Sequence, residues 1–201
     1  MTARTVVLVR HGVTDWNAQG RMQGHTDVPL NEVGLAQAAA MAPAVAALRP
    51  TRIVSSDLSR AVATAQALCD ACGVGVATDA RLRETDIGEW EGLTDADIAD
   101  QAPADGLGGE FDDDFRWSAT GETSNEATAR VVAAIREHAE SAAGDDVLVV
   151  VGHGAVLRDA VVRLMGLDAP LTVMSVMANC GWAILRPRAA YWRLVAYNVT
   201  A

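Results

Sequence analysis

Val6-Val7-Leu8-Val9-Arg10-His11-Gly12 is the stretch around which the chain is organised. Its four consecutive β-favouring residues, without a helical period, predict a strand buried inside a sheet that is covered on both faces. A guanidinium, an imidazole and a glycine, which permits a sharp turn, follow this strand directly. Ligands of open α/β sheets bind outside the carboxyl ends of the strands, so Arg10 and His11 lie where chemistry is expected. By themselves, the three residues are equally compatible with an ordinary surface loop.

A second strand is predicted over 52–56, and a helix follows it with Ser56 or Asp57 as its cap. Arg60 then falls in the first helical turn, where the helix dipole disfavours a cation. Either a local ion pair with Asp57 or an anion bound at the helix N-terminus and clamped by Arg60 would explain it. The proximity of Arg10 and His11 at a neighbouring strand end favours the anion.

A third unit of the same kind consists of a strand over 145–151, the triplet Gly152-His153-Gly154 and a helix from Ala155. A histidine held between glycines at a helix N-terminus suits contact with a phosphoryl oxygen. Three strand–loop–helix units therefore present basic groups and glycines to one edge of the sheet. Together they predict an oxyanion site.

The long segment from Val13 to Asp27 adds amide and guanidinium donors, because Asn17, Arg21 and Gln23 can all reach an anion seated at the strand ends. Long ordered loops in compact domains are usually functional. Asn31 is predicted to cap the helix that follows, which extends to about residue 48, before Pro50.

Three carboxylates in residues 81–93 are candidates for a general acid that protonates a leaving alkoxide. They are Glu84, Asp86 and Glu89, and their spacing alone does not choose among them. Residues 94–123 are rich in Asp and Gly, and we expect a short helix near 94–101 followed by an acidic excursion, either a solvated flap or a lid-like insertion. Thr123 and Glu126 form a capping-box pattern for a helix to about residue 143.

Further strands are predicted over 173–177, 182–185 and 191–197, the last two as a hairpin around Arg186-Pro187-Arg188. Cys69 and Cys72 resemble a redox motif, but they lie at the C-terminal end of a predicted helix, where the dipole does not stabilise a thiolate. We interpret them as small helix residues.

Composition restricts the class of protein. The 201 residues are 50% hydrophobic and 21% charged, which suits one globular domain spanning 1–201. With 26 acidic and 16 basic side chains, the net charge of −10 argues against binding to nucleic acid or an anionic membrane. The three cysteines and the absence of a signal-peptide pattern favour the cytoplasm. No metal-ligand spacing is present, and we expect no metal and no cofactor.

Taken in order, these motifs resemble the histidine phosphatase (phosphoglycerate-mutase-like) superfamily, and they span most of the chain: Arg10-His11-Gly12, Ser56 to Ala61, Leu82-Arg83-Glu84, Gly88 to Gly92 and Gly152-His153-Gly154. The resemblance implies a three-layer α/β/α sandwich with a mostly parallel central sheet. It also implies that His11 is the nucleophile that becomes phosphohistidine and Glu84 the proton donor. The implied phosphate pocket consists of Arg10, Arg60, His153 and Gly154, with Asn17 and Gln23 as further contacts.

The function expected from this resemblance is hydrolysis of a small phosphomonoester, of the sugar- or glycerate-phosphate type. One alternative is a phosphoglycerate mutase, against which the sequence Thr85-Asp86-Ile87-Gly88 after Glu84 argues, because mutases usually carry an Arg-His pair there. Another is a non-catalytic binding module, against which the retention of His11 and Glu84 argues. Any of Arg21, Arg83 and Arg116 can pair with a carboxylate of the substrate, and a homodimer is left open.

Overall fold

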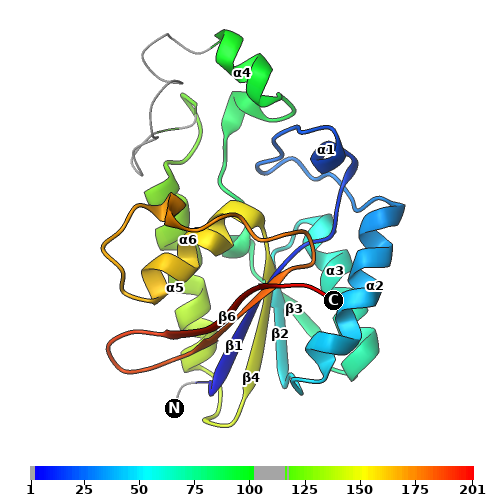
Figure 1. Ribbon diagram of the computed structural model, residues 1–201, viewed down its shortest axis with the longest axis vertical. Coiled ribbons are helices and arrows are strands. Elements are labelled where there is room, and N and C mark those ends of the chain that lie inside the picture. Colours follow the sequence, from blue (N-terminus) through cyan, green and yellow to red (C-terminus); the bar gives the residue numbers. More distant parts are fainter. Residues whose placement is uncertain (1–2, 102–115, 117) are drawn as a thin grey trace.

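The first apolar run forms the centre of a six-stranded sheet in the computed structural model, which describes residues 3–101, 116 and 118–201 (Figure 1). Strand β1 (Thr5–Arg10) pairs in parallel with β4 (Val147–Gly152) and antiparallel with β5 (Trp182–Arg186). Its four residues from Val6 to Val9 are fully buried. This burial on both faces accounts for the absence of polar and apolar alternation in the sequence.

The strand order is β3-β2-β4-β1-β5-β6, with β2 at Arg52–Ser55, β3 at Val76–Thr78 and β6 at Arg193–Val199. Strands β1 to β4 are parallel, whereas β5 and β6 form the antiparallel hairpin predicted from the sequence. Arg10 stands opposite Gly152, and Ser55 stands opposite Val151. The carboxyl ends of β1, β2 and β4 therefore meet at one edge of the sheet.

Helices cover both faces of this sheet (Figure 1). On one side, α2 (Glu32–Ala46) and α3 (Ser59–Cys72) pack with Val7 and Val9 of β1. On the other side, α5 (Ser124–Glu140) and α6 (Gly154–Leu164) pack with Val6 and Leu8. The predicted three-layer sandwich with a mostly parallel sheet is confirmed.

Helix ends follow the capping signals closely. Asn31 Oδ1 accepts a hydrogen bond from Gly34 N at the start of α2, and Thr123 and Glu126 form the capping box of α5. Helices α2 and α5 each end two or three residues before the predicted position. Gly73, at φ 73°, terminates α3 just after the cysteine pair.

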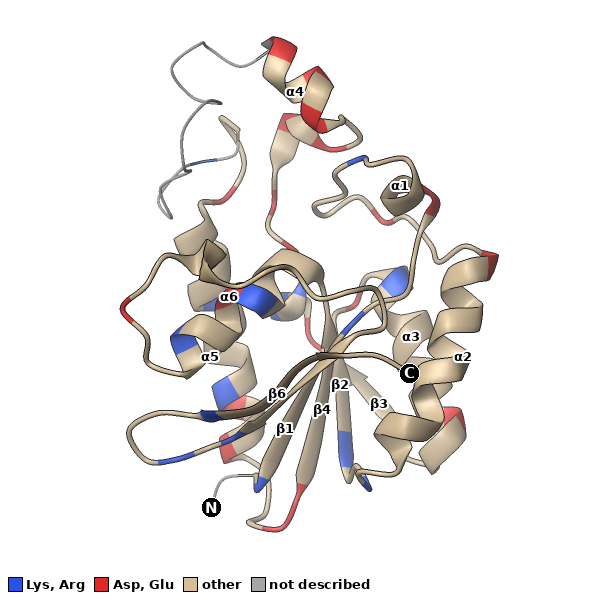
Figure 2. Ribbon diagram, in the orientation of Figure 1, with Lys and Arg blue, Asp and Glu red and all other residues tan. Residues whose placement is uncertain are grey.

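Short elements lie at the carboxyl edge of the sheet, where Figure 1 shows α1 (Asp15–Ala18) and α4 (Asp95–Gln101). Two 3-10 turns, Ala80–Leu82 and Gly88–Trp90, lead from β3 toward α4. The short helix near 94–101 is confirmed, and acidic residues mark it in Figure 2. Within the proposed lid, residues 102–115 and 117 lie outside the described residues. No helix in the part of the chain that the structure describes is long and apolar enough to cross a membrane.

The strand predicted over 173–177 is wrong. Residues 171–173 form a 3-10 turn, and those that follow are irregular. Side chains bind the carbonyls of this segment instead of a neighbouring strand: Tyr197 Oη donates to Ser175 O, and Arg10 Nη1 donates to Met177 O. Buried Met177 then anchors the segment in the core beside α5 and α6.

Candidate active site

His11 lies directly beyond the carboxyl end of β1 and is 3% exposed. Its Nδ1 is 2.7 Å from the carbonyl oxygen of Gly12, which can only accept a hydrogen bond. Nδ1 therefore carries the proton, and in the neutral ring Nε2 keeps its lone pair. Gly12 must be a glycine here, because a Cβ would lie 2.5 Å from the Gly34 carbonyl oxygen of α2. The Gly12 carbonyl thus fixes the tautomer of the His11 ring, and the close packing of the turn against α2 fixes the position of the ring.

The pKa of His11 is lowered well below its ordinary value. Burial is the largest cause, and the positive charges of Arg60 and Arg10 add to it, while the hydrogen bond to Gly12 opposes it. The imidazole is consequently neutral at physiological pH, the state in which Nε2 is a nucleophile.

Arg60 lies in the first turn of α3 and is completely buried. Its Nη1 and Nη2 donate to the carbonyls of Thr26 and Gly24, each at 2.8 Å. Its Nε donates to His153 Nδ1 at 3.2 Å. These three bonds leave two of the five guanidinium N–H groups for an anion.

Of the two explanations considered for Arg60, the local pair with Asp57 does not form, and the predicted cap of α3, Ser56 or Asp57, is wrong. Asp57 instead binds Arg83 through both carboxylate oxygens, at 2.8 and 2.6 Å. Leu58 occupies the N-cap position without a side-chain hydrogen bond. Because its own neighbour does not neutralise Arg60, the anion interpretation is the one that the geometry supports.

His153 precedes α6, is fully buried, and meets His11 edge to face with ring centroids 5.2 Å apart. Its Nδ1 accepts from Arg60, so Nε2 carries the proton and donates to Ser56 Oγ at 2.9 Å. Both ring nitrogens therefore have protein partners, although the sequence suggested direct contact with a phosphoryl oxygen. Burial, followed by Arg60, lowers the pKa of His153 as well.

The guanidinium of Arg10 has one nitrogen with a protein partner and one buried nitrogen without a partner in the described part of the chain. Its Nη1 donates to Met177 O at 2.6 Å, whereas its Nε is buried and has no hydrogen-bond partner among the described residues. A Cβ on Gly154 would lie 3.0 Å from this Nε, so the start of α6 packs directly against it. Buried donors are almost always satisfied in native proteins. The orphaned Nε therefore indicates a missing acceptor.

Glu84 is the one of the three candidate carboxylates that lines the pocket. Its two oxygens accept from Ala155 N and Val156 N, both at 3.1 Å, at the N-terminus of α6. Asp86 instead accepts from Gly88 N, and Glu89 binds Ser118. The turn between β3 and α4 thus directs one carboxylate inward and two away.

Asn17 and Gln23 are held with their amide oxygens toward the protein. Asn17 Oδ1 accepts from Thr14 N at 3.2 Å and from Asn179 Nδ2 at 3.3 Å. Gln23 Oε1 accepts from Thr14 Oγ1 at 3.0 Å. The NH₂ groups of both amides remain as donors, and both residues line the pocket.

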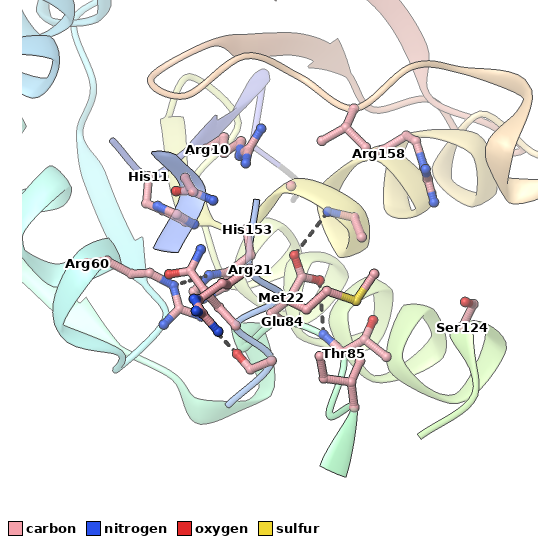
Figure 3. A pocket seen from close by; sticks show the side chains of 17 residues that line it. Arg10, His11, Arg21, Met22, Arg60, Glu84, Thr85, Ser124, His153 and Arg158 are labelled. Carbon is pink, nitrogen blue, oxygen red and sulfur yellow. Dashed lines mark hydrogen bonds between the residues drawn. The ribbon is translucent and has the colours of Figure 1, made fainter. Parts of the chain in front are cut away.

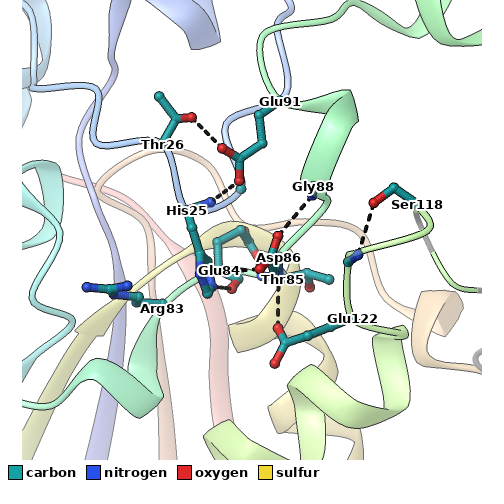
Figure 4. A network of polar contacts seen from close by, with 12 residues as sticks. His25, Thr26, Arg83, Glu84, Thr85, Asp86, Gly88, Glu91, Ser118 and Glu122 are labelled. Atoms are coloured by element: carbon teal, nitrogen blue, oxygen red, sulfur yellow. Dashed lines mark hydrogen bonds and ion pairs between the residues drawn. The ribbon is translucent and has the colours of Figure 1, made fainter.

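A polar network that the sequence analysis missed holds Glu84 against the loop that carries Gln23 (Figure 4). Glu91 accepts from the backbone N–H of His25 and from the Thr26 hydroxyl. The His25 ring donates through Nε2 to the Glu84 carbonyl at 2.9 Å. No spacing signal reveals these contacts, because each joins segments about 60 residues apart.

All eight predicted site residues line one pocket of about 230 Å³: Arg10, His11, Asn17, Gln23, Arg60, Glu84, His153 and Gly154. The other lining residues include Arg21, Met22, Ile87, Ser124, Arg158 and Val176. Arg83 and Arg116 are not among them and are paired with Asp57 and Glu126. The described residues contain no group of three or more His, Cys, Asp or Glu arranged to hold a metal ion.

Comparison with known proteins agrees with this geometry. Residues 6–200 match the model of the histidine phosphatase superfamily (branch 1). The chain belongs to that superfamily. It is 36% identical to the glucosyl-3-phosphoglycerate phosphatase of Mycolicibacterium vanbaalenii, over all of this chain and 97% of that one. It is also 36% identical to a probable phosphoglycerate mutase of Yersinia pestis, over 87% of this chain and 81% of the relative.

Solved structures extend the likeness. A mycobacterial glucosyl-3-phosphoglycerate phosphatase in complex with VO₃ superposes with a TM-score of 0.91 at 36% identity, covering 98% of this chain and 100% of that one. Bacillus stearothermophilus YhfR superposes with a TM-score of 0.88 at 25% identity, with 98% of each chain covered. The predictions of family and fold are confirmed.

Proposed function

We propose that this protein is a phosphomonoesterase that hydrolyses a small sugar- or glycerate-type phosphate through a phosphohistidine on His11. The observation that carries the proposal concerns two neighbouring groups: the buried Nε of Arg10, which has no hydrogen-bond partner within the described part of the chain, and a neutral His11 whose Nε2 is unprotonated. Arg60 adds two spare N–H groups to the same space. A phosphate dianion satisfies all of these donors and brings phosphorus to the nucleophile.

The reaction has two steps. His11 Nε2 attacks phosphorus while the ester P–O bond breaks, and Glu84 gives its proton to the leaving alkoxide. Arg10 and Arg60 neutralise the charge that collects on the phosphoryl oxygens. Glu84, now a carboxylate, then takes a proton from the water that attacks phosphorus, and the P–N bond breaks, which returns neutral His11 and releases phosphate.

Glucosyl-3-phosphoglycerate is the first substrate to test, because the relatives that match the whole chain carry that activity in their names. The Yersinia relative makes a phosphoglycerate mutase the second candidate. The chain favours hydrolysis, because Thr85-Asp86-Ile87-Gly88 follows Glu84 at the place where mutases usually carry an Arg-His pair.

The test is a substrate pulse followed by intact-mass analysis of wild type and His11→Ala, with glucosyl-3-phosphoglycerate, 3-phosphoglycerate and simple sugar phosphates. We expect a phosphorylated species and free phosphate from wild type and neither from the variant. A phosphorylated species that persists in His11→Ala would contradict the assignment of the nucleophile. Interconversion of 3- and 2-phosphoglycerate that outruns phosphate release would establish the mutase instead.

The proposal also covers the cellular location of the enzyme, its partners and its oligomeric state. We expect a cytoplasmic location and no nucleic-acid partner, in line with the net charge of −10. Whether the chain acts as a homodimer is decided by light scattering of the purified protein. The lid role of residues 94–123 is tested by replacing 102–115 with a short Gly-Ser linker and comparing kcat/KM across the same substrates.

A further inference from the structure

Arg158 is a cationic pocket residue to which the proposed reaction assigns no role. It lies on α6, four residues after Gly154, and therefore on the same face of the helix and about 6 Å further along its axis. It lines the same pocket as His11 and Arg60. Figure 3 shows it on α6, apart from the cluster of His11, Arg60 and His153.

Asp159 fixes the guanidinium of Arg158 through its Nε atom and leaves its two terminal nitrogens outside this contact. The Nε atom of Arg158 donates to Asp159 Oδ1 at 2.6 Å, and Asp159 is buried. The Arg158 side chain is only 15% exposed. Neither of its terminal nitrogens donates to a residue in the described part of the chain, so two parallel N–H groups remain for a planar anion. Paired N–H donors in this arrangement match a carboxylate bidentately.

The charge of the pocket leaves room for a second anion. Four arginines line the pocket, Arg158 is ion-paired with Asp159, and Glu84 holds the proton that the proposed first step requires. The pKa values of His11 and His153 are lowered and both rings are neutral, so the formal charge is three positive. A phosphate dianion neutralises two of these charges. One positive charge is left over, in a protein whose net charge is −10.

Other arginines considered from the sequence are engaged elsewhere. Arg83 and Arg116 form ion pairs with Asp57 and Glu126, outside the pocket lining. Arg21 does line the pocket, but its Nε and Nη1 donate to a glutamine side chain and a backbone carbonyl. Arg158 is therefore the lining arginine, beyond the phosphate cluster, with both terminal nitrogens available.

We propose that Arg158 binds a carboxylate of the substrate, so that the enzyme selects phosphomonoesters carrying a carboxylate a few bonds from the phosphate ester. In a 3-phosphoglycerate unit, the carboxylate carbon is four bonds from phosphorus, about 5 Å when extended. This distance agrees with the helical offset between Gly154 and Arg158. The proposal rests on the proposed phosphatase function and adds the class of substrate to it.

The experiment compares 3-phosphoglycerate with its primary amide, which keeps the planar shape of the carboxylate and removes its negative charge. The ratio of the two kcat/KM values is measured for wild type, Arg158→Gln and Arg158→Lys. A charge-assisted hydrogen-bonded contact predicts a ratio of about 10 to 100 in wild type and close to 1 in Arg158→Gln. Arg158→Lys keeps the charge without the fork, so it should fall between them.

Arg136→Gln is the matched control. Arg136 is exposed on α5 and does not line the pocket, so this substitution removes one positive charge without changing the pocket. It should keep the wild-type ratio, and thermal unfolding checks that each variant is folded. A wild-type ratio near 1 while both substrates are hydrolysed would overturn this proposal and leave the phosphatase standing. An unchanged ratio in folded Arg158→Gln would also overturn it. Absence of phosphate release from every substrate would instead reject the phosphatase.

Discussion

Two buried histidines make the stability of the folded chain depend on pH in the range where few other groups titrate. His11 and His153 have pKa values lowered well below the ordinary value, chiefly by burial and then by Arg60. In the unfolded chain both rings take up a proton near their ordinary pKa of about 6.5. The unfolded state therefore binds more protons as the pH falls, and acidification below that value favours unfolding.

The size of the effect follows from linkage. If the folded state stays unprotonated at both rings, lowering the pH from about 7 to about 5 costs about 1.9 kcal/mol for each histidine and about 4 kcal/mol for the pair. That is a large part of the 5–15 kcal/mol that is typical of a domain. Above about pH 7 the dependence should disappear, because both states are then neutral at these rings.

Urea unfolding at several pH values, in a buffer free of phosphate, measures this dependence for wild type, His11→Gln and His153→Gln. Each variant is compared with its own value near neutral pH, so a constant loss of stability from the substitution cancels. Each should lose about half of the wild-type pH dependence. If both variants keep the full dependence, the buried histidines are not its source and the reasoning is refuted.

Four other changes test the site. Glu84→Gln should lower kcat by roughly 10²–10⁴ on alkyl phosphates and less on p-nitrophenyl phosphate in pre-steady-state measurements, because the latter's leaving group needs little protonation; equal losses would make Glu84 a shaping residue only. Gly154→Ala should raise the Kd for inorganic phosphate about tenfold by calorimetry, since its Cβ would lie 3.0 Å from Arg10 Nε; an unchanged Kd would contradict this. Asn179→Ala removes the donor to Asn17 Oδ1 and should lower kcat/KM several-fold, about 1 kcal/mol, without changing the unfolding temperature much. Activity should survive exhaustive chelation, and loss restored by a divalent ion would indicate a different enzyme class.

Much of the fold was predictable because its signals are local. The run from Val6 to Val9 is apolar at every position, as a strand covered on both faces must be. Asn31 and Thr123 satisfy the first amides of their own helices, so their effect is visible within four residues of sequence. The segment 173–177 has the composition of a strand, but its carbonyls are bound by side chains of Arg10 and Tyr197, which composition does not reveal.

The same distinction applies to the candidate site. Arg10 ends β1, His11 follows it, and His153 follows β4; because these strands are parallel neighbours, the convergence of the three side chains was predictable from two local patterns. The partner of Asp57 was not, because Arg83 reaches it from a segment 26 residues away and competes with the sequence neighbour. Arg158 carried a weak signal, namely its position one helical turn after the glycine of the third motif.

The hydrogen bonds from Arg60 to the carbonyls of Gly24 and Thr26 have a consequence for redesigning this enzyme. Randomising residues 23–26 in a library would move the loop and, with it, the buried Arg60 guanidinium. Most variants in that library would therefore bind every phosphate ester more weakly. The side chains of Met22, Arg158 and Val176 line the pocket without holding Arg60. Substitutions at those three positions should change which phosphate ester binds in the pocket without moving the site that binds the phosphate group.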